Sequence, residues 1–240
     1  MKPLRVFQLI TLVGLSGTAR ALSAQTQQPV ALEVKLKNLH LWRGVVYCNS
    51  PVTTFELPYK TEDGAFKMGA WGGFSLNGRW KDINYYVEYA QSGFALRVTD
   101  DPSSHDIFDT HTDHLVYVDV SYTLQNERFP LKMLWSPMIS GRDTYVDKRG
   151  KEKNRYSNYV ALRVPVWKRE NQCVTLGDGG AFSLADTPSN FYGEHAHVTN
   201  VFAEYESMIQ VSKHAVSLSI KAVWNPENHN GVLQIAFQLL

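Results

Sequence analysis

Residues 115–123, LVYVDVSYT, place an apolar side chain at every second position. One face carries Val116, Val118, Val120 and Tyr122, and the other carries Tyr117, Asp119, Ser121 and Thr123. Because successive side chains of a strand point to opposite faces, this alternation predicts a half-apolar β-strand. The same alternation occurs in 83–89, 159–166 and 215–224, and helical periodicity is found nowhere over a useful length. The chain is therefore predicted to be all-β.

Weaker segments complete a set of twelve predicted strands. They lie near 32–45, 51–60, 65–76, 83–91, 94–100, 114–123, 130–137, 157–167, 173–180, 197–211, 215–224 and 231–240. The connections after even-numbered strands are short, whereas most of those after odd-numbered strands are longer. An even strand count with short turns at one end and long loops at the other is typical of bacterial outer-membrane barrels. The prediction is a closed antiparallel transmembrane β-barrel of 12 strands, with a soluble secreted β-sandwich as the alternative.

The last predicted strand supports closure. It places Leu233, Ile235, Phe237 and Leu239 on one face. Pairing of this strand with the first one would leave no open sheet edge, which lipid does not tolerate. Trp42, Trp167 and Trp224 fall at predicted strand ends, where tryptophan rings can lie at a membrane boundary.

The N-terminus reads as a secretory signal over residues 1–24. Lys2 and Arg5 precede an apolar run from Val6 to Leu15, and small residues follow at 19–24. We expect this signal to be cleaved on export, with a short segment at 25–31 and the barrel over 32–240. Past residue 24, no uninterrupted apolar run approaches the ~18 residues of a spanning helix.

Charge argues against a nucleic-acid partner. Loss of Lys2, Arg5 and Arg20 would reduce the 24 basic residues to 21 against 23 acidic ones, a formal charge of −2. A nucleic-acid-binding domain would carry a clear basic excess. The expected partners are instead outer-membrane lipid, the barrel-assembly machinery acting on the C-terminal strand, and small polar solutes.

Several motifs resemble those of one family, the TorF-like porins of Gram-negative outer membranes. They are Leu41-Trp42-Arg43-Gly44-Val45, Gly69-Ala70-Trp71-Gly72-Gly73, Tyr85-Tyr86-Val87-Glu88-Tyr89, Trp135-Ser136-Pro137-Met138, Tyr156-Ser157-Asn158-Tyr159-Val160 and Asn225-Pro226. The resemblance spans most of the chain after residue 24. It implies an outer-membrane location and a pore, with no catalytic residues to carry over. One departure is that Phe237 is out of phase with Leu240, whereas this family usually has an aromatic in phase with the last residue.

The polar faces of the strands predict a charged lumen. The candidate pore-lining residues are Glu33, Lys35, Lys37, Glu56, Lys67, Glu88, Arg97, Asp119, Arg163, Glu204, Glu206 and Lys221. Acids and bases are equal in number, so no ion preference is predicted. Barrels of ~8 strands are filled and those of ~16 hold an aqueous channel, so twelve strands permit either a narrow pore or an interior closed by ion pairs. We favour passive passage of small polar solutes, with a closed barrel whose outer loops bind a ligand or partner as the alternative.

No catalytic, cofactor or metal site is predicted. The loop 104–114 holds three histidines and three aspartates, which are zinc-ligand types, but their spacing matches no compact motif. His195 and His197 are weaker candidates. An outer-membrane hydrolase would need a histidine beside an outward serine such as Ser207, and none is predicted there. We therefore expect no enzyme.

Cys48 and Cys173 are the only cysteines. The predicted topology places Cys48 in the first outer loop and Cys173 just past a turn at the opposite end. A disulfide needs Cα atoms within ~7 Å. Two free thiols are therefore predicted.

Overall fold

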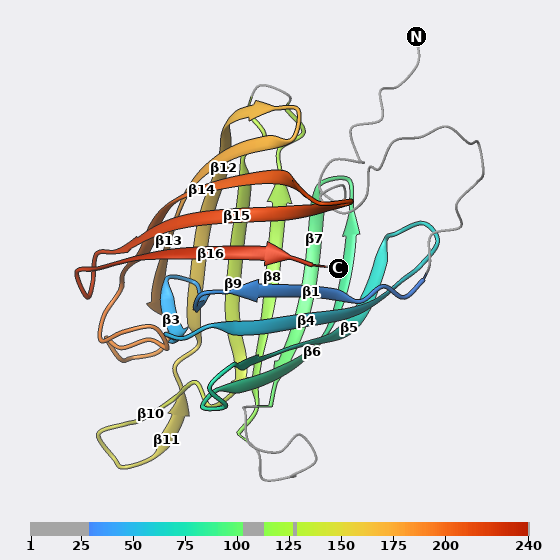
Figure 1. Ribbon diagram of the computed structural model, residues 1–240. Helices are drawn as coiled ribbons and strands as arrows, with labels where there is room; N and C mark the ends of the chain where they lie inside the picture. The colour runs from blue at the N-terminus through green and yellow to red at the C-terminus, as the bar shows by residue number, and fades with distance from the viewer. Residues whose placement is uncertain (1–28, 103–112, 127–128, 240) are drawn as a thin grey trace.

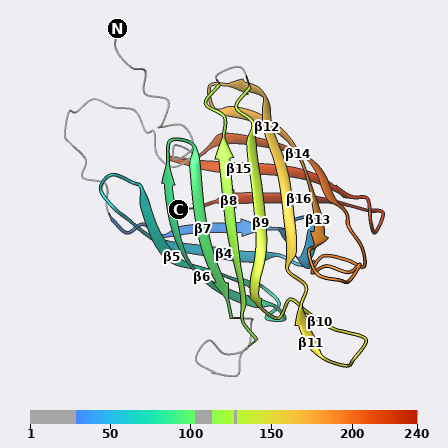
Figure 2. The same cartoon turned by 180° about the vertical axis from the view of Figure 1, so that it is seen from behind.

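The structure is a computed structural model that describes residues 29–102, 113–126 and 129–239. The predicted signal at 1–24 and most of the segment at 25–31 lie outside these residues. Twelve antiparallel strands form a closed barrel in the order β1-β16-β15-β14-β13-β12-β9-β8-β7-β6-β5-β4 (Figures 1 and 2). This confirms the predicted fold class. The β-sandwich architecture of the alternative is wrong, because one sheet closes on itself.

The wall strands are β1 (Glu33–Lys37), β4 (Val52–Lys60), β5 (Phe66–Ser75), β6 (Lys81–Gln91), β7 (Phe94–Asp101), β8 (Leu115–Thr123), β9 (Lys132–Gly141), β12 (Ser157–Arg169), β13 (Gln172–Ser183), β14 (His197–Val211), β15 (His214–Asn225) and β16 (Asn230–Gln238). Two short hairpins form separate sheets and are not part of the barrel wall. One consists of β2 (His40–Trp42) and β3 (Val45–Cys48), and the other of β10 (Thr144–Val146) and β11 (Glu152–Asn154).

The barrel closes through its first and last strands, as the sequence predicted. Leu36 of β1 pairs with Phe237 of β16 on one side and with Thr53 of β4 on the other. Since both neighbours of β1 are hydrogen-bonded, the described sheet has no free edge. Register places the start of β1 toward the end of β4, and the end of β16 toward the start of β15. The first and last wall strands therefore begin and end, respectively, at the short-turn end of the barrel.

Most connections alternate in length, as predicted, although the β8–β9 connection at 124–131 is longer than those at 76–80 and 226–229. The turn between β6 and β7 is the pair Ser92 and Gly93, with φ angles of 52° and 86°. Positive φ at both central positions is typical of the type I′ turn, whose twist matches that of the flanking strands. The opposite end carries the long connections, including β10–β11, which projects away from the wall (Figure 1).

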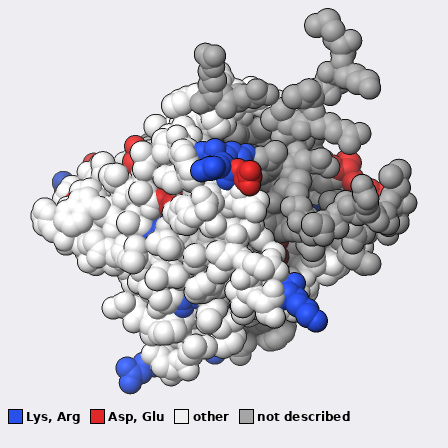
Figure 3. Space-filling model, turned by 45° about the horizontal axis from the view of Figure 1, so that its top comes forward, with Lys and Arg blue, Asp and Glu red and all other residues white. Residues whose placement is uncertain are grey.

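The two faces of the wall differ in chemistry. Exposed apolar side chains cover the outward face, among them Leu57, Met68, Val87, Leu96, Trp135, Leu162, Leu176, Val201 and Leu233. Figure 3 shows one side of the molecule on which uncharged side chains form a broad surface with few charged groups. The inward face carries most of the charges. A globular protein reverses this arrangement, so the barrel interior is not a conventional hydrophobic core.

The first strand differs from its prediction. It ends at Lys37 rather than near residue 45, and residues 38–51 leave the wall to form the β2–β3 hairpin. We call residues 38–51 the lumen hairpin. Trp42 is therefore inside the barrel and not at a strand end of the wall, while Trp167 and Trp224 are exposed on the wall as predicted. The hairpin departs because its polar tip finds partners on the inward faces of distant strands.

In the described ranges there is no helix with the length and apolar character needed to cross a membrane.

Candidate functional site: the charged lumen and its hairpin

The lumen hairpin crosses the barrel near the long-loop end. β2 and β3 pair only with each other, so side chains and single backbone groups hold the hairpin to the wall. At its base, the Asn38 side chain bonds Leu233 O and Ile235 N of β16. At its tip, Asn225 of β15 donates to the carbonyl oxygen of Gly44 at 3.3 Å.

Gly44 allows the tip to approach β14 closely. Its φ is +85°, in the region that favours glycine, and a Cβ here would lie 2.4 Å from the carbonyl oxygen of Thr199. Any other residue would push the tip away from the wall. The Arg43-Gly44 pair thus forms the turn that lets the hairpin reach across the lumen.

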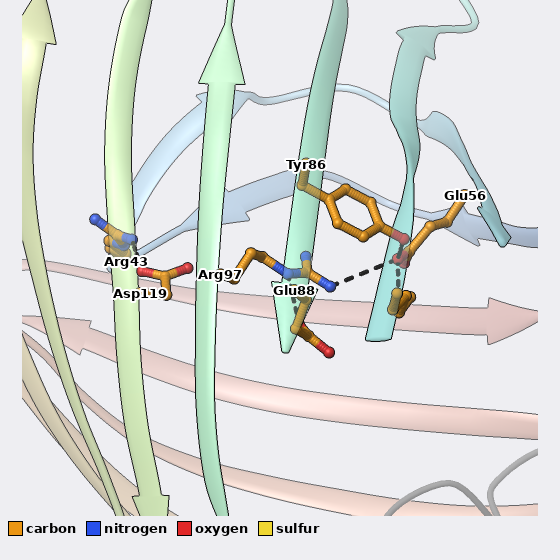
Figure 4. A network of polar contacts seen from close by, with 7 residues as sticks. Arg43, Glu56, Tyr86, Glu88, Arg97 and Asp119 are labelled. Carbon is orange, nitrogen blue, oxygen red and sulfur yellow. Dashed lines mark hydrogen bonds and ion pairs between the residues drawn. The ribbon is translucent and has the colours of Figure 1, made fainter. Parts of the chain in front are cut away.

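Arg43 anchors the tip of the hairpin to β8 and β9, across the lumen from β1. Its Nη2 donates to Asp119 Oδ1 of β8 and to Ser136 Oγ of β9, both at 2.6 Å. Its Nη1 donates to the Tyr192 hydroxyl at 2.5 Å. The guanidinium carbon lies 4.4 Å from the ring centre of Trp42, and the side chain is only 7% exposed. Figure 4 shows Arg43 against Asp119 beside β8.

Two more aromatic rings complete the surroundings of this guanidinium. The carbon lies 4.9 Å from the Tyr117 ring centre and 5.1 Å from that of Tyr159. Aromatic faces attract cations at such distances. We call Tyr117, Asp119, Ser136, Tyr159 and Tyr192 the guanidinium cage. Trp42 also packs against Tyr117, Phe191 and Tyr192, so the hairpin and the 184–196 loop contact each other in the lumen.

A second set of charges lies along β4–β7. Glu56 accepts from Lys67 Nζ at 2.8 Å and from the Tyr86 hydroxyl at 2.5 Å. Arg97 Nε donates to Glu88 at 2.7 Å, and its guanidinium carbon lies 4.0 Å from the Tyr86 ring centre (Figure 4). Oppositely charged side chains therefore alternate from strand to strand around this part of the wall.

A third set lies on β12–β15. Arg163 donates to Glu204 at 2.9 Å, Ser219 donates to the same carboxylate at 2.9 Å, and Lys221 Nζ is 3.5 Å away. Lys221 Nζ also lies 3.9 Å from the Phe202 ring centre. The Arg163 side chain is 41% exposed, so the space that it borders is open to solvent.

The strand register places all twelve sequence-predicted lumen residues on the inward face. Eight take part in ion pairs: Glu56, Lys67, Glu88, Arg97, Asp119, Arg163, Glu204 and Lys221. The other four form no ion pair among the described residues: Glu33, Lys35, Lys37 and Glu206. That these side chains line a conducting pore stays a prediction.

Sequence reasoning missed further basic residues of the lumen, among them Lys60, Lys132 and Arg43. Lys60 and Lys132 share the inward face, since Lys60 pairs with Lys67 and Lys132 with Arg163. The alternation within their strands could have identified both. Arg43 could not be identified in this way, because it reaches the lumen from a hairpin and not from the wall.

His40 of β2 fixes the base of the hairpin by stacking. Its ring centre lies 4.9 Å from that of Trp80 and 5.3 Å from that of Trp71. Burial, aided by the charge of Lys37, lowers the pKa of His40 to about 3. The Nδ1 atom has no hydrogen-bond partner among the described residues. The ring is therefore held neutral between two tryptophans.

Acid is expected to loosen the hairpin through His40. Because its pKa is lower in the folded state than the usual 6.5, the neutral ring's contribution to stability is present above that value and is lost as the pH falls toward about 3. Tryptophan fluorescence should report this change, since Trp71 and Trp80 contact the ring. His40→Phe keeps the stacking and removes the titration, so its acid response should be smaller. Identical acid responses of the two proteins would contradict the assignment.

The remaining candidates are placed as follows. Cys48 and Cys173 are both free thiols, as predicted, although Cys48 is buried in the lumen hairpin rather than in an outer loop. Residues 103–112 of the His/Asp-rich loop lie outside the described residues, and His114 contacts Asp100 at 2.9 Å. His195 contacts Glu227, and Ser207 lies on the outward face, where it is 7% exposed. In the described part of the chain, no group of three metal-ligating side chains is arranged to hold an ion.

No protein-family model matches this sequence, and no curated protein matches it significantly. The resemblance to TorF-like porins thus stays a prediction.

Proposed function

We propose that this protein is an outer-membrane β-barrel that gives small polar solutes passive passage through a lumen narrowed by residues 38–51. The observation that carries the proposal is the two-faced wall, apolar outside and charged inside. In lipid every backbone polar group must be satisfied internally, and a closed barrel meets this condition. Export through a cleaved signal at 1–24 is part of the proposal.

Aromatic side chains at the short-turn rim support a membrane location. Tyr59, Tyr89, Phe94 and Tyr122 are exposed close to the turns of their strands. Register pairs Phe94 with Tyr122 across β7 and β8. Girdles of this kind flank the apolar band of outer-membrane barrels. The resemblance to TorF-like porins is consistent with the same location.

The lumen supports passage of polar rather than apolar solutes. Three sets of charged side chains face it, and the partly exposed Arg97, Arg163 and Glu88 border water-accessible space. Acids and bases are interspersed on the inward face, so we expect weak ion selectivity. The lumen hairpin lies across this space, so we expect it to form the constriction.

The hydrogen bonds that hold Arg43 favour a second candidate function, a closed barrel whose outer loops bind a ligand or partner. Three hydrogen bonds fix a side chain that is only 7% exposed, which holds the hairpin across the lumen. Under this candidate the ion pairs would serve to fill the interior. A porin-like barrel should conduct ions across a bilayer, whereas a closed barrel should not.

Planar bilayers distinguish the two candidates. The purified full chain should first show a mobility shift between unboiled and boiled gel samples, as a membrane barrel does. Its reconstitution should then give small, stable single-channel openings. Folded protein without stable openings would contradict passage and support the closed barrel. Absence of the protein from the outer-membrane fraction of the producing cells would contradict the proposed location.

A further inference from the structure

Arg43 occupies its surroundings as a ligand occupies a binding site. Its guanidinium is the only part of residues 38–51 that the cage residues hydrogen-bond. Every cage residue comes from the wall or from the 184–196 loop, and the hairpin contributes only Trp42, which packs against Tyr117 and Tyr192. The cage supplies a carboxylate, two hydroxyl groups and aromatic faces, a combination that recognises a planar cation.

The geometry selects a guanidinium over an ammonium group. Nη1 bonds Tyr192, whereas Nη2 bonds both Asp119 and Ser136. The two nitrogens therefore contact partners on different elements while the guanidinium carbon stays 4.9 and 5.1 Å from the Tyr117 and Tyr159 ring centres. An ammonium group has one nitrogen and no plane to stack, so it cannot make both sets of contacts.

Release of the hairpin tip would break the bonds of Arg43 and the Asn225–Gly44 bond but would leave the wall intact. The strands of the hairpin pair only with each other, so its release breaks no bond of the wall ladder. A cavity of about 230 Å³ lies beside the tip, bordered by Gly44, Val45 and Val46 on one side and by Val223 and Val232 on the other. The tip is therefore not close-packed on the side that faces β15 and β16.

We propose that the guanidinium cage is a binding site for guanidinium-bearing solutes, and that Arg43 is its tethered occupant. A free guanidinium compound competes with Arg43 for the cage, and its binding releases the hairpin tip. The inference extends the proposed passage by naming a solute class, but it does not require conduction, because binding can be measured on folded protein in detergent. A tethered group competes with an effective concentration of roughly millimolar, so we expect free compounds to bind the intact chain weakly.

The first test empties the cage. Arg43→Ala removes the tethered occupant, and methylguanidinium chloride is titrated while tryptophan fluorescence is followed, since six tryptophans include Trp42 beside the cage. We expect a saturable change at a concentration about tenfold or more below that needed for the intact chain. Methylammonium chloride at equal ionic strength should have no such effect. The matched control is Arg43→Ala with Asp119→Asn, which removes the carboxylate and should lose the response.

The second test uses the intact chain and does not depend on the folding of any variant. Cys48 is buried in the hairpin, whereas Cys173 lies on β13 and serves as an internal reference. Methylguanidinium should accelerate maleimide labelling of Cys48 relative to Cys173, and methylammonium should not. Arg43→Gln is a further variant that can be titrated if Arg43→Ala does not fold.

Three results would overturn the proposal. They are equal effects of methylguanidinium and methylammonium, an unchanged response after Asp119→Asn, and a Cys48 labelling rate that methylguanidinium leaves unaltered in the intact chain. A barrel that binds methylguanidinium but gives no openings would refute passage and leave the cage assignment supported. Failure of the proposed binding site can thus be distinguished from failure of the proposed passage.

Discussion

Replacing residues 39–50 by two glycines is expected to raise the single-channel conductance several-fold while the barrel remains folded. Lys37 and Val52 are directly paired across β1 and β4, so their Cα atoms are about 5 Å apart and a four-residue loop of Asn38, two glycines and Pro51 can join them. No wall pairing is lost, because β2 and β3 pair only with each other. The lumen loses Trp42, Arg43 and the aromatic contacts around them.

The β10–β11 hairpin provides a matched control. Replacing residues 146–152 by Asn-Gly keeps the pairing of Tyr145 with Lys153 and removes a similar projection outside the barrel. Its conductance should equal that of the full chain. Heat-modifiable gel mobility should show that both variants are folded. If the shortened lumen loop gave the same conductance as the intact chain, the hairpin would not be the constriction.

Leu162→Arg is expected to lower the free energy of unfolding in lipid vesicles by about 2–4 kcal/mol, the cost of a basic residue near the bilayer midplane. Leu162 lies in the middle of β12 and is 45% exposed on the outward face. In a water-soluble barrel the same change at so exposed a position would shift stability by only about 0.5 kcal/mol. Urea unfolding of the reconstituted protein measures the difference.

Val166→Arg is the control for depth. Val166 lies on the same strand, is exposed, and is closer to the short turn that follows Arg169. The penalty near the membrane interface falls to about 0–1 kcal/mol. A much larger cost for Leu162→Arg than for Val166→Arg would locate the bilayer along β12. Equal small costs would argue that this face meets water.

The sequence predicted the wall closely because wall strands follow a local rule. In 115–123 and 215–224 the period of two assigns each side chain to one face, and the register confirms the same assignment. The same rule placed Glu56, Asp119 and Glu204 inside, and loop lengths placed both chain ends at one rim. It held even where Pro58 interrupts a strand, because Pro58 still pairs with Gly69 in the ladder.

The alternation rule did not predict the conformation of residues 38–51. The sequence predicted that the first strand continues to about residue 45, although the alternation changes phase between Leu36 and Leu39. A change of phase alone does not distinguish a bulged strand from a hairpin that turns inward. The difference is made by partners far along the chain: Asp119 and Ser136 bond Arg43, and Thr199 lies against Gly44. A buried guanidinium is stable only where such partners converge.

The sequence alone therefore determined the strand count, the closure and the chemistry of each face, because these depend on the alternation of neighbouring residues. Only the tertiary structure decided how the lumen is filled. It showed which charges pair, that a hairpin crosses the barrel, and that Arg43 is enclosed by five residues from distant segments. These features depend on distances between strands that become neighbours only when the barrel closes.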